Sequence, residues 1–205
     1  MKNMTHKLKV LTSVAIATVF VAVPLAVSAQ AASDTKSTTI NAVIASTISM
    51  TTSGNITFNI TPTGSGAQSN AADTVTVATN NSSGYNLKLS DADAATTLLN
   101  TPDTLTAHAG TLAAPTALAN GTWGYHLDGA GGMGTGGAVE TNLATSTLKY
   151  AGVKPLATPD TIKTTAAPSA GAGDVSTVYY GAKVDTSKKS GTYTGVVTYT
   201  ATTNP

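Results

Sequence analysis

The chain has 205 residues and a formal net charge of only +1, and it contains no cysteine. Such a balance offers no strongly basic surface, which argues against nucleic acid as a partner. The lack of thiols excludes disulfides, thiolate metal sites and cysteine nucleophiles, so packing and strand pairing must stabilise the fold.

The first 31 residues have the pattern of a secretory signal peptide. Lys2, Lys7 and Lys9 precede an apolar run over residues 10–27, and small residues follow, which predicts cleavage after Ala29 or Ala31. An uncleaved membrane anchor is the alternative, but the apolar run is short for a spanning helix. We therefore expect an exported mature chain over 32–205 that forms one domain and has no other membrane span.

Strand patterns begin early in the mature chain. Ile56, Phe58 and Ile60 alternate with polar residues, which predicts a half-buried strand over 55–60. Residues 74–77 and 85–90 form two further alternating runs. Because a short loop rich in asparagine, serine and glycine joins these two runs, we expect them to form a β-hairpin.

The middle of the chain, about 91–174, is expected to be an irregular insertion. Within it, residues 122–127 alternate and predict a strand that carries Trp123, Tyr125 and Leu127 inward. Residues 148–150 suggest a short edge strand. The three prolines and many small residues between 155 and 173 predict an extended surface loop.

The C-terminal part has the clearest alternation. Residues 178–184 and 193–201 alternate, with a turn over 185–191, and threonines cover the outer face of the last run. We expect the last strand to be an integral part of a sheet. The fold class is therefore predicted to be all-β, an antiparallel two-sheet β-sandwich of the immunoglobulin-like kind with long Gly/Pro/Thr-rich loops.

Catalytic patterns are weak. Residues 129–134 match G-x-G-x-x-G, but no helix-forming run follows, so we expect no nucleotide and no other cofactor. His108 and His126 are expected to be solvated, and neither lies near a G-x-S-x-G turn. Glu140 is the single glutamate, so the paired carboxylates of a glycosidase are not evident. We expect no catalytic residues and no enzyme activity.

Two residue pairs are candidates for binding. Trp123 and Tyr125 could form an aromatic platform for a ligand, or they could belong to the core. Asp91 and Asp93 could contribute to a calcium site, or they could be ordinary polar residues of a loop. Because two oxygen ligands fall short of what calcium requires, we expect no metal.

Two segments resemble the WxL domain of bacterial cell-surface proteins. One is Gly84-Tyr85-Asn86-Leu87, similar to the Gly-Trp-x-Leu motif of that family. The other begins at Gly191-Thr192-Tyr193 and ends with Tyr199-Thr200-Ala201, similar to the family's last strand. Tyr85 and Tyr199 stand where the family has tryptophan, and Ala201 stands where it has leucine. The resemblance implies a β-rich domain that holds non-covalently to the cell wall.

Taken together, these patterns predict an exported, non-enzymatic structural or adhesive protein of a bacterial cell surface, located outside the membrane. One alternative is a module that binds peptidoglycan or another carbohydrate. A second alternative is a subunit of a surface filament or surface layer, joined to its neighbours by strand exchange. The expected partners are therefore a wall polymer, other surface proteins or further copies of the chain.

Overall fold

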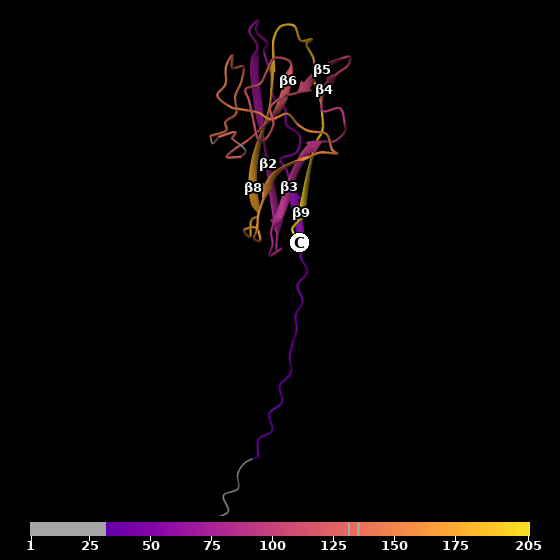
Figure 1. Cartoon of the computed structure of the whole chain (residues 1–205), viewed down its shortest axis with the longest axis vertical. Helices are drawn as coiled ribbons and strands as arrows, with labels where there is room; N and C mark the ends of the chain where they lie inside the picture. The colour runs from indigo at the N-terminus through magenta and orange to yellow at the C-terminus, as the bar shows by residue number, and fades with distance from the viewer. Residues whose placement is uncertain (1–31, 131, 135) are drawn as a thin grey trace, which may run out of the picture. The chain divides into compact units, whose positions relative to one another are not determined.

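The computed structural model describes residues 32–130, 132–134 and 136–205, and this part of the chain contains nine β-strands and no helix (Figure 1). The predicted signal peptide, residues 1–31, lies outside the described residues. Residues 43–205 form one compact unit, whereas residues 32–42 belong to a separate N-terminal unit. The all-β class predicted from the sequence is therefore confirmed for the described residues.

The larger sheet has six strands. Their order across the sheet is β1 (Ile48–Thr51), β2 (Ala67–Thr79), β8 (Asp174–Val184), β6 (Thr122–Leu127), β5 (Asp103–Ala107) and β4 (Leu98–Asn100). The two longest strands, β2 and β8, run antiparallel from the pair Ala67–Val184 to the pair Val77–Asp174. The pairing of β5 with β6 is parallel, which corrects the expectation of wholly antiparallel sheets.

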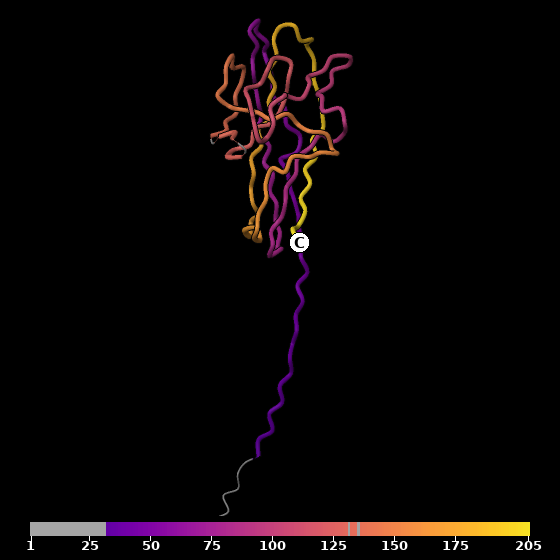
Figure 2. Tube along the Cα trace, viewed as in Figure 1, coloured from indigo at the N-terminus to yellow at the C-terminus, as the bar shows by residue number. Residues whose placement is uncertain are grey.

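The smaller sheet has three strands, β7 (Asp160–Thr164), β3 (Tyr85–Asp91) and β9 (Val197–Thr203), in that order. β3 pairs antiparallel with β9 along its whole length, so the C-terminal strand is an integral strand, as predicted. The tube in Figure 2 shows the chain leaving β8, turning at the far end and returning through the yellow β9.

One apolar core receives side chains from both sheets, which makes the fold β-sandwich-like. The predicted inward faces are confirmed, because the alternate residues 123, 125 and 127 of β6 and 178, 180, 182 and 184 of β8 are all buried. β3 contributes Tyr85, Leu87 and Leu89, each fully buried. Alternation therefore identified the buried face of the strands correctly.

Two side-chain hydrogen bonds, each made by a tyrosine of the larger sheet, link the two sheets. The Tyr180 hydroxyl on β8 lies 2.6 Å from the Tyr199 hydroxyl on β9. The Tyr125 hydroxyl on β6 donates to Asp160 Oδ2 on β7, at 2.7 Å. A buried phenol that finds a partner avoids the free-energy cost of an unsatisfied polar group, so these contacts join the two layers without disrupting the core.

The predicted hairpin is wrong. The run over 74–77 belongs to β2 in the larger sheet, whereas the run over 85–90 belongs to β3 in the smaller sheet. The loop between them folds around Asn81, whose side-chain amide donates to the carbonyls of Gly84 and Asn204 at 2.8 Å. The chain therefore crosses from one layer to the other, because β2 pairs with β1 and β8 instead.

Residues 55–60 are extended but form no strand, which corrects the first strand prediction. Ile56, Phe58 and Ile60 are half-buried and pack against the core, and the polar residues between them are exposed. The backbone of residues 55–60 makes no hydrogen bond to any other described residue. The alternation predicted the side-chain environment correctly, but not the pairing.

The expectation of an irregular insertion over 91–174 also needs correction. This range supplies β4, β5 and β6 to the larger sheet and β7 to the smaller one. β7 lies within the predicted surface loop over 155–173. Instead of the predicted edge strand over 148–150, Tyr150 and Ala151 form single bridges to Thr116 and Tyr125.

Candidate functional site

The Trp123 and Tyr125 side chains lie in the core. Trp123 is 3% exposed, and its indole N–H donates to the carbonyl of Thr96 at 3.1 Å. Tyr125 is fully buried. The pair therefore occupies the core position that the sequence left open as the alternative, and it presents no aromatic surface to solvent.

Tyr125 belongs to a polar cluster that the sequence did not indicate. Asp160, which is 5% exposed, accepts the Tyr125 hydroxyl on one oxygen. Its other carboxylate oxygen lies 2.6 Å from Lys154 Nζ. Burial, and then the hydrogen bond to Asp160, raise the pKa of Tyr125 well above the ordinary value. At neutral pH the cluster therefore holds a neutral phenol against an ion pair.

This cluster lies at one end of an open groove of about 670 Å³, called here the β7 groove. It runs along β7 and is bounded by residues 111–113, Ala130 and Lys154. Leu112 and Ala130 also pack against the apolar core, and Ile162 of β7 belongs to it. The groove is therefore apolar at its base and polar at its rim, which suits an extended peptide better than a charged small molecule.

A second groove, of about 470 Å³, lies where β1 and the end of β2 meet residues 168–171. Thr79 donates its backbone N–H to Ser169 Oγ at 2.8 Å, which holds the 168–171 segment against the end of β2. Small and hydroxylated residues line it, and no titratable side chain is among them.

The prediction that both histidines are solvated is wrong. His126 is fully buried on the outer face of β6, between the rings of Tyr150 and Tyr179. Its Nδ1 lies 2.9 Å from the carbonyl of Lys149, so this nitrogen carries the proton. His108 is 7% exposed and contacts the hydroxyls of Thr116 and Thr122, and burial lowers its pKa.

His126 is buried because a loop covers the outer face of the larger sheet. Gln68 and Asn70 of β2 both donate to the Tyr150 hydroxyl, at 3.3 and 2.9 Å. Glu140 accepts from Gln68 Nε2 at 2.8 Å and from Ser146 Oγ at 2.7 Å. The loop around Glu140 is thus bonded to the sheet, and Glu140 forms part of a structural network.

The glycine-rich segment that matches a nucleotide motif is a closed turn. Gly129 N–H donates to the carbonyl of Gly134 at 2.6 Å, and the Met133 side chain is buried. Gly129, Gly132 and Gly134 have positive φ angles, which glycine adopts without strain. No described residue of this turn begins a helix, so the helix N-terminus that would hold a pyrophosphate is not formed here.

Asp91 and Asp93 act within consecutive turns. Asp91 Oδ1 accepts the backbone N–H of Asp93 at 3.2 Å, and Asp93 Oδ1 accepts that of Ala95 at 2.7 Å. Asp91 is 3% exposed, and burial raises its pKa. Among the described residues, no three potential metal ligands come together. In the described structure both carboxylates therefore accept backbone hydrogen bonds in the turns of a loop.

Lys154 and Asp160 were missed because no local pattern marks them. They flank a proline-containing loop, and only the pairing of β7 with β3 brings Asp160 opposite Leu89 and into the core. The Gln68–Asn70 region was missed because it lacks the apolar alternation of the rest of β2.

The sequence matches no family model, and comparisons with curated proteins and with solved structures find no match. The described residues include no helix of the length and apolar character needed to span a membrane. What this chain does must therefore be inferred from its own residues.

Proposed function

We propose that the chain is an exported structural or adhesive protein of a bacterial cell surface, and that it works by binding other macromolecules rather than by catalysis. The observation that carries this proposal is the combination of a two-layer β fold with an exposed apolar segment. Ile40, Val43 and Ile44 are 89%, 95% and 84% exposed. Exposed apolar side chains in a row are typical of an interaction site.

The proposal of export comes from residues 1–31, with their basic start, apolar run and small-residue exit. A β-sandwich without cysteine is compatible with an oxidising environment outside the membrane, because it has no thiol that could be oxidised. The rigid layers would carry their contact surfaces on strand edges and on the loops between strands.

We also propose that the sandwich is immunoglobulin-like and similar to the WxL domain. The support is that the two matching segments lie on neighbouring strands, since Tyr85 starts β3 and Tyr199 lies on β9. Tyr199 pairs with Leu89 in the β3–β9 ladder. The wall-binding alternative has less support, because Trp123 and Tyr125 are buried and cannot stack on a sugar.

Fractionation of the native cells tests the proposal. The chain should be found in the medium or the wall fraction, with a mass that shows loss of the first 29 or 31 residues. Purified cell walls added to the processed protein should separate wall binding from other surface roles. Recovery of the full-length chain from the cytosol alone would refute export.

A further inference from the structure

The residues before β1 have the side-chain pattern of a core strand but no partner among the described residues. Ile40, Ala42 and Ile44 are in phase with Ile48 and Met50 of β1, whose side chains pack against the core. The chain from residue 37 to residue 44 makes no hydrogen bond within the described structure. An extended apolar segment that belongs to no strand therefore precedes β1, and its Ile40, Val43 and Ile44 side chains are exposed to water.

We propose that residues 40–44, called here the donor segment, pair with the outer edge of β7 in a second copy of the chain. This inference rests on the proposed surface function and names its partner. The donor segment would lie in the β7 groove as a fourth strand of the smaller sheet, with Ile40, Ala42 and Ile44 facing the groove.

β7 is the strand edge best suited to receive it. In the larger sheet, β1 contacts β9, and β4 is bonded at Leu99 to Thr194 through N–O distances of 2.8 and 3.1 Å. In the smaller sheet, β9 faces β1, whereas the outer edge of β7 makes no backbone hydrogen bond to other described residues. An edge of this kind can pair with an extended peptide through main-chain hydrogen bonds.

The chemistry of the two surfaces matches. Residues 37–47 carry no charged side chain, so they can enter an apolar groove without desolvating a charge. Ile162, Leu112 and Ala130 offer the groove an apolar base. The donor segment and β7 each have five residues, so one can pair with the other along its full length.

The proposed partner is a second copy, because in its own chain the donor segment is tethered at Ala45 and makes no hydrogen bond to β7 in the described structure. The side chain of Asn80, at the end of β2, donates to the carbonyl of Ala45 at 2.9 Å and accepts the N–H of Thr47 at 2.7 Å. Ile44 directly precedes Ala45, and the Cα atoms of the two residues are about 3.8 Å apart.

Such pairing is heterologous, since the surface that donates differs from the surface that accepts. Each copy that receives a donor segment still offers its own, so the contact can continue from copy to copy. The expected product is an open chain of subunits rather than a closed dimer.

Self-association of the processed protein tests the inference. The double variant I40D/I44D should weaken self-association by more than about tenfold, since it would place charges in an apolar groove. The matched variant T39D/N41D adds the same charge on the opposite face and should assemble like the wild type. Equal assembly by both variants, or a wild type that stays monomeric at every concentration, would overturn the inference.

Disulfide trapping tests the acceptor edge, and the cysteine-free chain makes it specific. A V43C variant mixed with T161C or K163C should give a heterodimer with one of the two, which also reports strand direction. T200C, on the exposed face of β9, is the control and should give at least tenfold less heterodimer. Equal trapping at Thr200 would overturn the inference. The proposed surface location is tested separately, by the fractionation of cells.

Discussion

Two segments of this molecule share a sequence pattern and differ in what they contact. The C-terminal run over 193–201 has apolar or small residues at every second position, and the N-terminal run over 38–47 has Ile40, Ala42 and Ile44 at the same spacing, although residues 42–45 are apolar throughout. Residues 197–201 of the first run lie in β9, which pairs with β3 and packs against the core. The second leaves Ile40 and Ile44 almost fully exposed.

The difference shows what alternation does and does not encode. It sets which side chains share a face, because successive residues of an extended chain point to opposite sides. It does not name the strand that will cover that face. Residues 55–60 make the same point within the fold, since their apolar side chains reach the core while their backbone stays unpaired.

The largest expected effect is a loss of folding free energy at alkaline pH, and it comes from the tyrosines of the folded unit rather than from the N-terminal run. All seven tyrosines lie in residues 43–205, and burial raises the pKa of Tyr85 and Tyr150 to about 12 and that of Tyr125, Tyr180 and Tyr199 further. The folded state keeps these protons where the unfolded chain loses them, so this stability is complete below pH ~10 and is lost above it. Each tyrosine contributes up to about 1.4 kcal/mol per pH unit.

Urea unfolding at pH 8 to 11 measures this effect. The unfolding free energy of the Tyr85→Phe variant should fall less steeply with pH than that of the wild type, because the variant has one fewer buried hydroxyl with a raised pKa. An unfolding free energy that stays constant to pH 11 would show that these phenols are not buried.

A core substitution should have the next largest effect. Leu87→Ala in β3 removes a fully buried side chain and should lower the free energy of unfolding by about 2–5 kcal/mol. Ile44→Ala removes a side chain that is 84% exposed and should change it by less than about 0.5 kcal/mol in the monomer. Chemical denaturation at low protein concentration checks both, and similar losses would mean that Ile44 packs within its own chain.

A smaller effect is expected at the polar network on the outer face of the larger sheet. Asn70 donates to the Tyr150 hydroxyl and to the carbonyl of Ala138, and accepts the N–H of Glu140. Asn70→Ala should therefore cost about 1–3 kcal/mol and expose His126 to exchange with solvent. Asn59→Ala, at an exposed amide, is the control. Unchanged stability and an unchanged His126 NMR signal would contradict the network.

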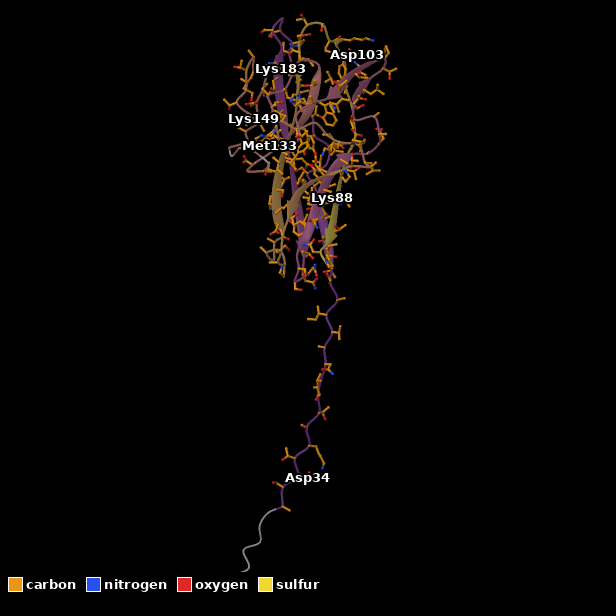
Figure 3. All side chains as sticks on the ribbon, viewed as in Figure 1. Asp34, Lys88, Asp103, Met133, Lys149 and Lys183 are labelled. Carbon is orange, nitrogen blue, oxygen red and sulfur yellow. The ribbon has the colours of Figure 1, made fainter. Side chains whose placement is uncertain are left out.

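The smallest effect is expected at a half-buried contact at the start of β5, near the Asp103 label in Figure 3. Asp103 accepts from the Tyr193 hydroxyl at 2.6 Å and from Lys188 Nζ at 3.2 Å, which lowers its pKa below the usual 3.8. The contact stabilises the fold above that pH and is lost as pH falls below it. Asp103→Asn should thus lower Tm slightly at pH 7, and the difference should shrink toward pH 2.

Asp34→Asn serves as the control for this variant, since Asp34 is exposed and contacts only Lys36 among the described residues. A Tm difference for Asp103→Asn that is the same at pH 7 and pH 2 would mean that the carboxylate charge plays no part.

The sequence predicted the buried faces well and the neighbours poorly. The inward set of Trp123, Tyr125 and Leu127 followed from period-two alternation alone. The hairpin prediction was wrong because it assumed that runs close in sequence pair with each other, whereas β2 pairs with the long strand β8. His126 was predicted to be exposed because it faces outward, but Tyr150 of the covering loop and Tyr179 of β8 pack against its ring and bury it.

The candidate grooves depend on those long-range contacts. The β7 groove exists because β7 pairs with β3 while residues 111–113 and Ala130 approach from other segments. No local pattern joins these residues, so sequence reasoning could not find the site. The donor segment was not predicted either, because nothing local in the sequence shows that the side chains of residues 40–44 stay exposed.

Hydrogen–deuterium exchange of the processed protein, measured at dilution and at assembling concentration, tests the central claim most directly. At dilution, amides of residues 40–44 should exchange within seconds, while those of β9 remain protected. At high concentration, residues 40–44 and β7 should both gain protection. Rapid exchange of residues 40–44 at every concentration, or protection of that segment in the isolated monomer, would contradict the account.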